Sequence, residues 1–258
     1  MARPKRVLAI GDLHCGHRVG LTPPQWQDRS PERVKYHKIQ SECWNAFDNM
    51  VQALKPIDIL IVNGDAIDGR GERSGGTELI TVDRNVQCNM AVYAIKHIGA
   101  KNVVLTYGTP YHTGQLEDIE NTIADRVKGE IHSHEWIDIE GTVFDIKHKV
   151  GSSSIPHGKG TAIAKDRLWN LLWSEHGEQP KADVLLRSHV HYHFHVGEPG
   201  WLAMTLPALQ GQGTKFGARQ CSGIVHFGMV HFDCSKEGYT WAPHVLRLQS
   251  QKRTARRL

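Results

Sequence analysis

The sequence predicts an α/β fold, and three observations support this prediction. Short apolar, β-branched segments alternate with amphipathic helical segments through the first two thirds of the chain. Gly-rich polar turns follow several of the strand-like segments. The 258-residue chain has a mass of 29.0 kDa and is 40% hydrophobic and 22% charged, which is typical of a soluble globular protein. We therefore expect a parallel or mixed sheet covered by helices.

The first elements have clear local signals. Residues 6–10 read as a strand that leads into Gly11-Asp12. Residues 57–62 are an apolar, β-branched segment that ends in Asn63-Gly64-Asp65, which predicts a strand followed by a loop. Between them, residues 31–54 follow a helical pattern, with Ser30 as the N-cap and Pro31 in the first turn.

The alternation continues along the chain. Helical segments are predicted at residues 83–98, 116–128 and 161–175. The strand-like segments that accompany them are 102–107, 135–139, 142–149 and 183–186. In the helix at 161–175, Trp169, Leu172 and Trp173 recur at helical spacing, so we expect them in the core rather than on a stacking surface.

The last third of the chain is strand-like without helical segments. Its predicted strands are 191–196, 202–206, 223–232 and 238–246. These strands suggest a second sheet within the same domain. We expect one domain over residues 1–250, followed by a basic tail at 251–258 that is flexible and solvated.

Charge and cysteine content exclude several classes of protein. The net charge is +4, but the tail and the N-terminal residues Arg3, Lys5 and Arg6 together carry more positive charge than this total. The rest of the chain is therefore net negative, which argues against a surface that coats nucleic acid. No apolar run approaches the roughly 20 residues of a membrane span, and no export signal is evident, so we expect a cytoplasmic protein. Five cysteines without a CxxC pair argue against a disulfide framework and a cysteine zinc site.

Histidines and aspartates gather where the predicted strands end. The chain contains 17 histidines. Asp12 and His14 follow the first strand, and His189 and His191 follow a later one; residues two apart on an extended segment point the same way. Mixed carboxylate and imidazole ligands suit Zn, Fe, Mn, Ni or Co. Two such ions about 3.5–4 Å apart can hold a phosphate group and activate a water molecule.

Five motifs occur in a fixed order along residues 10–191. They are GDLHCGH, GDAIDGRG, the Gly108–His112 turn GTPYH, a lone strand histidine at 148, and SHVH at 188–191. In this order they resemble the motifs of the calcineurin-like metallophosphoesterase superfamily, whose pattern is DxH, GDxxD, GNH, H and GHxH. The GTPxH turn resembles that of phage-type members. The resemblance implies a four-layer α/β/β/α sandwich of two mixed sheets flanked by helices.

The resemblance also implies a site with two divalent ions, with Mn most expected and Fe, Zn, Ni or Co as alternatives. It assigns Asp12, His14 and His191 to the first ion, and His148 and His189 to the second ion. It assigns Asp65 as the ligand that bridges both ions. His112 matches the histidine of GNH and would act on the phosphate as a general acid or transition-state stabiliser. Asp68 matches the second Asp of GDxxD and would orient a ligand.

One motif departs from the family pattern. Thr109 stands where the family has an Asn ligand, and two residues separate it from His112. A threonine hydroxyl is a poorer ligand than an amide oxygen, so the second ion would bind weakly or take an extra water molecule.

The expected function is hydrolysis of a phosphoester by a hydroxide that bridges the two ions, without a covalent intermediate. The substrate is expected to be a small or nucleotide-like phosphodiester, with a DNA or RNA nuclease or a phosphomonoesterase as alternatives. A degenerate site in a metal-binding scaffold protein is the alternative of another class. No membrane and no obligate protein partner are expected.

Overall fold

The computed structural model of the chain describes residues 3–30, 34–114, 119–153, 155–212, 225–252 and 255, and it describes residue 73 by its backbone alone. Two mixed sheets form its centre. The first has the order β11-β10-β1-β2-β3-β4, with strands Gly238–Leu246, Phe227–Ser235, Lys5–Ile10, Ile59–Asn63, Asn102–Thr106 and Glu130–His132. The second has the order β5-β6-β7-β9-β8, with strands Glu135–Ile139, Thr142–Ile146, Val184–Arg187, Trp201–Thr205 and Phe194–Glu198.

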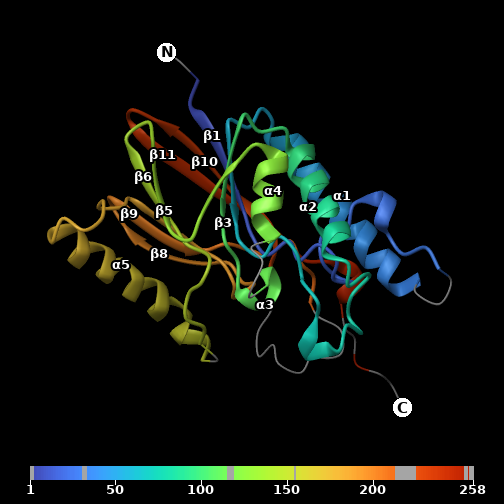
Figure 1. Ribbon diagram of the computed structural model, residues 1–258. Helices are drawn as coiled ribbons and strands as arrows, with labels where there is room; N and C mark the ends of the chain where they lie inside the picture. Colours follow the sequence, from blue (N-terminus) through green and yellow to red (C-terminus); the bar gives the residue numbers. More distant parts are fainter. Residues whose placement is uncertain are drawn as a thin grey trace.

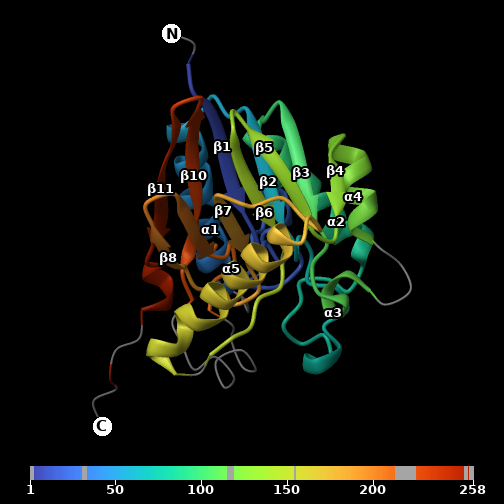
Figure 2. The same ribbon diagram turned by 90° about the vertical axis from the view of Figure 1, so that its left-hand side faces the viewer.

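The helices lie on the two outer sides of the paired sheets. Helices α1 (Val34–Leu54), α2 (Arg84–Ile98) and α4 (Ile119–Val127) cover the first sheet, and α5 (Lys159–Glu175) covers the second (Figure 1). The short helix α3 (Pro110–Thr113) lies beyond the sheets, among the loops that follow the strands (Figure 2). Short 3-10 turns occur at Pro24–Trp26, Glu72–Ser74, Pro156–Gly158 and Gln249–Gln251. The layers therefore run helix, sheet, sheet, helix, which confirms the predicted fold class.

Strand β1 shows why its sequence is apolar without alternation. Leu8 and Ile10 pack into the core between the first sheet and its helices, whereas Val7 and Ala9 pack into the core between the two sheets. Both faces of this central strand are therefore buried, as in parallel sheets. In the core between the sheets, the rings of Phe144 and Phe232 meet edge to face with centroids 5.1 Å apart. A third, smaller core lies between α5 and the second sheet.

The late strands do not form one sheet, contrary to the sequence prediction. Strands β8 and β9 belong to the second sheet, but β10 pairs antiparallel with β1 and carries β11 to the edge of the first sheet. In this position, β10 takes the edge of β1 that β2 leaves free. The sequence also did not predict β4, which pairs parallel with β3, or the single helical turn of α3.

The other predicted elements lie within a few residues of the observed ones. Asp83, the first residue of a predicted helix, is the N-cap of α2, and its side chain accepts hydrogen bonds from the backbone N–H groups of Asn85 and Val86. The Glu140-Gly141 turn joins the antiparallel strands β5 and β6. The predicted first turn at Pro31 and most of the basic tail lie outside the described residues.

The predicted burial of the α5 aromatic residues is wrong. Trp169, Leu172 and Trp173 are 48%, 45% and 46% exposed, because α5 turns Ile163, Arg167 and Asn170 toward the second sheet instead. The four described cysteines are free and buried.

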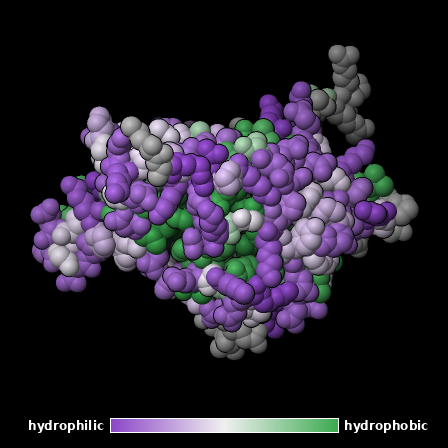
Figure 3. Space-filling model, turned by 90° about the horizontal axis from the view of Figure 1, so that it is seen from above, coloured by the Kyte–Doolittle hydropathy of each residue, from purple (hydrophilic) through white to green (hydrophobic). Residues whose placement is uncertain are grey.

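The face of the molecule drawn in Figure 3 is mostly polar. Figure 3 views the end of the molecule at which β1 begins, and hydrophobic residues gather near the middle of this face between hydrophilic borders. Among the described residues, no helix combines the length and apolar content needed to cross a membrane.

Candidate metal centre

The turns that follow β1, β2, β3 and β7 meet at one end of the paired sheets. Backbone hydrogen bonds tie the first two turns together, because the N–H groups of Asp12 and His14 donate to the carbonyl groups of Gly64 and Asp65. The turn after β7 joins them, with the backbone N–H of His189 donating to the Asp12 carboxylate at 3.0 Å. The sheet topology thus brings together three motifs that are far apart in the sequence.

A first group of possible ligands consists of Asp12, His14 and His191, whose ligand atoms lie within 4.8 Å of one another. The Nε2 atoms of His14 and His191 face each other at 3.1 Å, and His191 Nε2 lies 3.4 Å from Asp12 Oδ1. Asp12 and His14 are almost completely buried. The group matches the ligands that the resemblance assigns to the first ion.

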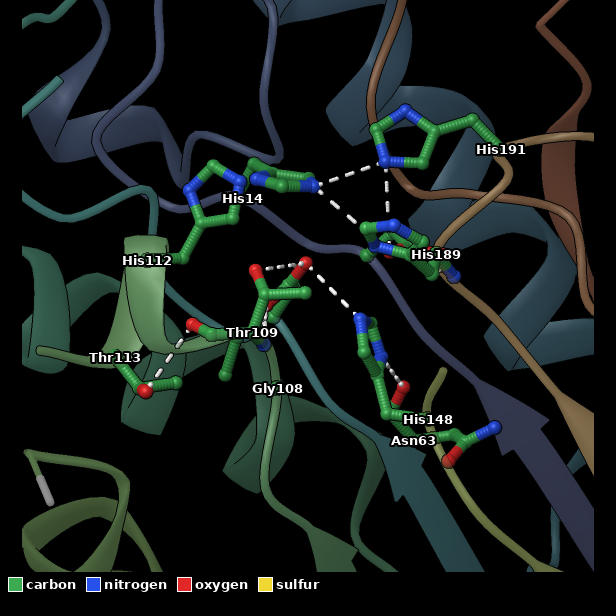
Figure 4. A network of polar contacts seen from close by, with 12 residues as sticks. His14, Asn63, Gly108, Thr109, His112, Thr113, His148, His189 and His191 are labelled. Carbon is green, nitrogen blue, oxygen red and sulfur yellow. Dashed lines mark hydrogen bonds and ion pairs between the residues drawn. The ribbon is translucent and has the colours of Figure 1, made fainter. Parts of the chain in front are cut away.

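A second group consists of Asp65, His148 and His189, again within 4.8 Å. His148 Nε2 lies 3.1 Å from Asp65 Oδ2. His148 is 2% exposed and Asp65 is 1% exposed. The rings of His148 and His189 meet edge to face with centroids 5.4 Å apart. The group holds the bridging ligand and the two histidines that the resemblance assigns to the second ion. Figure 4 shows the labelled histidines of both groups around a common centre.

The backbone of this region is strained. Among the described residues, the non-glycine residues with positive φ are Asp12, His14, Asp65, Lys128, Glu140, His189 and His191. Only Lys128 and Glu140 of this set lie outside the two ligand groups. A positive φ costs energy in residues with a side chain, and such strain concentrates at functional sites. The strain therefore marks the same residues as the motifs.

Neighbouring groups orient the histidine rings. His14 Nδ1 donates to Asp68 Oδ1 at 2.9 Å, and His148 Nδ1 donates to the Asn63 carbonyl at 2.8 Å. Each bond places the ring hydrogen on Nδ1 and leaves Nε2 as the atom that faces the centre. Carboxylate and carbonyl partners of this kind fix the tautomer of metal-binding histidines. Asp68 is thus the carboxylate that contacts the His14 ring on the side away from Nε2.

His112 sits at the border of the centre, on α3. Its Nδ1 donates to the backbone carbonyl of Asp68 at 2.8 Å, and its ring meets that of His14 with centroids 4.6 Å apart. His14, Asp68 and His112 form a third group of possible ligands within 4.8 Å. The two residues inserted before His112 therefore do not displace it from the site, because α3 turns it back.

Thr109 forms its contacts with Asp65, a candidate metal ligand. Its backbone N–H donates to Asp65 Oδ1 at 2.7 Å, and its hydroxyl oxygen lies 3.2 and 3.3 Å from the two Asp65 carboxylate oxygens. Gly108, the residue before it, passes so close to Asp65 that a Cβ atom there would collide with Oδ1. This turn therefore holds the Asp65 carboxylate in place.

Charges inside the centre shift the pKa values of its members. Burial opposes the charged form of His148, but the Asp65 carboxylate outweighs it and raises the pKa of His148 to about 9. For His14, burial and the neighbouring His112 lower the pKa to about 4. Burial likewise disfavours charge on Asp12 and His191, yet their mutual attraction lowers the pKa of Asp12 and raises that of His191. A cation could replace the proton on His148.

The donor set suits divalent transition metals. Imidazole nitrogens and carboxylate oxygens together suit Zn, Fe, Mn, Ni or Co. His148 Nε2 is buried and has no hydrogen-bond partner, although it lies at ion-pair distance from Asp65. A buried nitrogen without a hydrogen bond is costly unless it binds something else. The residues present therefore fit metal ions.

The sequence analysis missed Glu120, a supporting residue on α4. Its carboxylate is 1% exposed and accepts hydrogen bonds from the backbone N–H groups of Ala66 at 3.0 Å and Gly108 at 2.7 Å. It thus joins the residue after Asp65 to the residue before Thr109. Burial, followed by the nearby Asp65 charge, raises the pKa of Glu120 to about 7. In the sequence, this glutamate resembles an ordinary solvated residue of a helical first turn.

Gln87 is a second supporting residue that the sequence did not reveal. It is completely buried on α2, and its amide exchanges hydrogen bonds with both backbone groups of Gly69, at 2.9 and 2.8 Å. It therefore fixes the loop that begins at Asp68. A buried glutamine in a helix has no distinctive sequence signal.

Comparison with known proteins shows similarity only at the level of structure. No protein-family model and no curated protein matches the chain. Vps29 from Chaetomium thermophilum is 11% identical with a TM-score of 0.49, over 95% of this chain and 97% of that chain. An archaeal phosphodiesterase is 11% identical with a TM-score of 0.47, over 93% and 99%. Zinc-complexed Vps29 from Entamoeba histolytica is 13% identical with a TM-score of 0.45, over 93% and 98%.

The fold and the donor set define the class of this protein. It is an α/β protein of two mixed sheets with histidine and aspartate groups, at one end of the sheets, that could bind metal ions.

Proposed function

We propose that the chain is a dinuclear metal-dependent phosphoester hydrolase. One observation carries the proposal: two separate groups of three ligand candidates, each with one aspartate and two histidines, occupy adjoining turns. A single structural ion would need only one closed group. Asp65, held by Thr109 and near both groups of histidines, is proposed to bridge the two ions.

The ions would stabilise negative charge on the phosphoryl group and make water nucleophilic at neutral pH. The chain's own residues then position the substrate and supply a proton to its leaving oxygen. The Asp68 carbonyl accepts a hydrogen bond from Nδ1 of His112. The other ring nitrogen, Nε2, is therefore the atom that can exchange a proton with the substrate. We propose that His112, in its protonated form, donates to the leaving oxygen.

We propose a phosphodiester, small or nucleotide-like, as the substrate. An alkoxide leaving group gains most from an acid such as His112. Lys159 Nζ lies 4.5 Å from the ring centroid of Tyr192, the residue that follows the candidate ligand His191 in the sequence. This amine could attract a second anionic part of the substrate. Nuclease and phosphomonoesterase activities are the alternatives on the same site.

A metal-binding scaffold is the second candidate function, and Thr109 favours it. The hydroxyl is directed at the Asp65 carboxylate, so the second ion would have one ligand fewer than with an amide at this position. A scaffold would bind metal without turnover.

The test compares hydrolysis of bis-p-nitrophenyl phosphate and p-nitrophenyl phosphate by chelator-stripped protein, with Mn, Zn, Ni, Co or Mg restored singly. Asp65→Asn removes the proposed bridge, and Asp125→Asn, an exposed change on α4, is the matched control. We expect two ions per chain, diester turnover exceeding monoester turnover, and loss of both turnover and one ion in Asp65→Asn.

Each other result has a definite meaning. Faster monoester turnover would replace the diesterase with a phosphatase. Bound metal without turnover for any ion would favour the scaffold. Full activity of Asp65→Asn would refute the two-ion mechanism.

A further inference from the structure

Helix α5 exposes an apolar stripe, which we define as Leu168, Trp169, Leu172 and Trp173. These side chains are 56%, 48%, 45% and 46% exposed. They lie at positions i, i+1, i+4 and i+5 and therefore form one continuous face over two turns. The indole rings of Trp169 and Trp173 stack with centroids 6.3 Å apart.

The stripe is not the main face that holds the helix on the protein, although Trp169 and Trp173 also border a pocket with Asp145 and Arg187 of the second sheet. Ile163, Arg167 and Asn170 are the buried residues of α5, and Arg167 and Asn170 bind the Ala182 backbone through hydrogen bonds. The helix lies on the outer side of the second sheet (Figure 1). An outward helix face is normally polar, and a contiguous apolar patch marks an interaction surface.

Charges at the two ends of the stripe indicate which partner fits it. Lys165 precedes the stripe by one turn, and Glu175 follows it; both are exposed. Neither forms an ion pair within the described part of this chain. A ligand for the stripe should therefore present an acidic group at one end, a basic group at the other, and apolar side chains between them.

A second copy of α5, running antiparallel, has this arrangement. A two-fold axis near the middle of the stripe, between residues 170 and 171, places Lys165 beside Glu175 of the partner subunit, and the reverse contact follows by symmetry. A parallel arrangement would instead bring like charges together. The antiparallel arrangement also places the positive end of each helix dipole beside the negative end of the other, which is electrostatically favourable. We propose that this chain forms a homodimer through the stripe on α5.

The area of the stripe predicts the strength of the dimer. A tryptophan side chain offers up to about 250 Å². Two half-exposed tryptophans and two half-exposed leucines therefore supply about 400 Å² per copy, against about 800 Å² per partner in a standard interface. We expect a reversible dimer in the micromolar range rather than an obligate one.

The test is sedimentation velocity of the full chain from low micromolar concentration to the highest soluble one. We expect the monomer–dimer equilibrium to shift with concentration. Trp169→Glu should raise the dimer Kd at least about tenfold, because it places a charge at the centre of the interface. Thermal unfolding and circular dichroism of each variant show that it remains folded.

Charge reversal distinguishes a second copy from any other partner. Lys165→Glu and Glu175→Lys should each weaken the dimer, and the double variant should restore it, since the two charges meet across the two-fold axis. Lys38→Glu, an exposed change on α1, is the matched control and should leave the Kd unchanged.

Three results would overturn the proposal: a monomer at every concentration, a dimer insensitive to Trp169→Glu, or single charge reversals that the double variant does not rescue. Binding of a monomeric protein to phosphatidylcholine vesicles, lost in Trp169→Glu, would assign the stripe to a lipid surface instead.

Discussion

Removal of the Glu120 carboxylate tests how the candidate metal centre is held together. Glu120 accepts two buried backbone hydrogen bonds, from Ala66 and Gly108, and these two bonds hold its carboxylate in position. Glu120→Ala leaves both N–H groups without this acceptor. Each unpaired buried donor costs about 1–3 kcal/mol. Relief of the cost of burying a carboxylate offsets part of this loss, so we expect about 2–4 kcal/mol of destabilisation.

Glu120→Gln separates the two hydrogen bonds. The amide oxygen can replace one acceptor, but the amide NH₂ group then faces the other backbone N–H, so about 1–3 kcal/mol should be lost. Asp125→Ala, an exposed change on the same helix, should alter stability by less than about 0.5 kcal/mol. Urea unfolding of chelator-treated protein at pH 8 measures these differences.

Metal affinity is the second readout for the same variants. The two bonds join the turns that carry Asp65 and Thr109, so Glu120→Ala should weaken metal binding in addition to lowering stability. Calorimetric titration with Mn or Zn measures this effect at a temperature where the variant is folded. A stability loss below about 1 kcal/mol together with unchanged metal affinity would refute the role of Glu120 as the link between these turns.

Three further predictions address the centre itself. His112→Ala should lower turnover by about 10²–10⁴-fold with metal content retained, as measured by steady-state kinetics and elemental analysis; loss of an ion would instead make His112 a ligand. Because the pKa of His148 is raised to about 9, its proton must leave when a metal binds, so the apparent metal affinity should rise about tenfold per pH unit up to about pH 9. A flat pH dependence in calorimetry would contradict this. Gly108→Ala forces a Cβ atom against Asp65 and should cost about 1–3 kcal/mol and weaken metal binding, whereas Gly151→Ala, with ordinary contacts only, should do neither.

Local sequence patterns were sufficient to locate most elements and to bring the candidate ligands together. Strands such as β1 and β2 are continuous apolar segments that end in Gly-Asp, and both properties depend on adjacent residues alone. The carboxyl ends of neighbouring parallel strands meet at one edge of a sheet, so motifs that follow those strands converge. This is why the residues that follow these strands could be expected near one another, whereas the assignment of Asp12, His14 and Asp65 to one metal site was implied by the family resemblance of their motifs.

Supporting contacts could not be predicted in the same way. Glu120 and Gln87 act through hydrogen bonds to backbone groups of distant loops. Nothing in a helical pattern distinguishes a glutamate that accepts two buried N–H groups from one that faces water. The same limit applies to Thr109, whose contact with Asp65 depends on the path of the turn after β3.

Two larger features were decided by tertiary structure alone. The sequence indicated a second sheet for the late strands, but β10 pairs with the edge of β1 that β2 leaves free and so satisfies the backbone N–H and C=O groups of that edge. The spacing of Trp169 and Trp173 defines a helix face but not its direction. That direction was set by Ile163, Arg167 and Asn170, which pack against the second sheet and leave the tryptophans about half exposed. The sequence by itself thus determined which residues form each element and where the chemistry lies, because both depend on local order. Which faces meet depends on competition among distant surfaces, and only the folded chain resolves it.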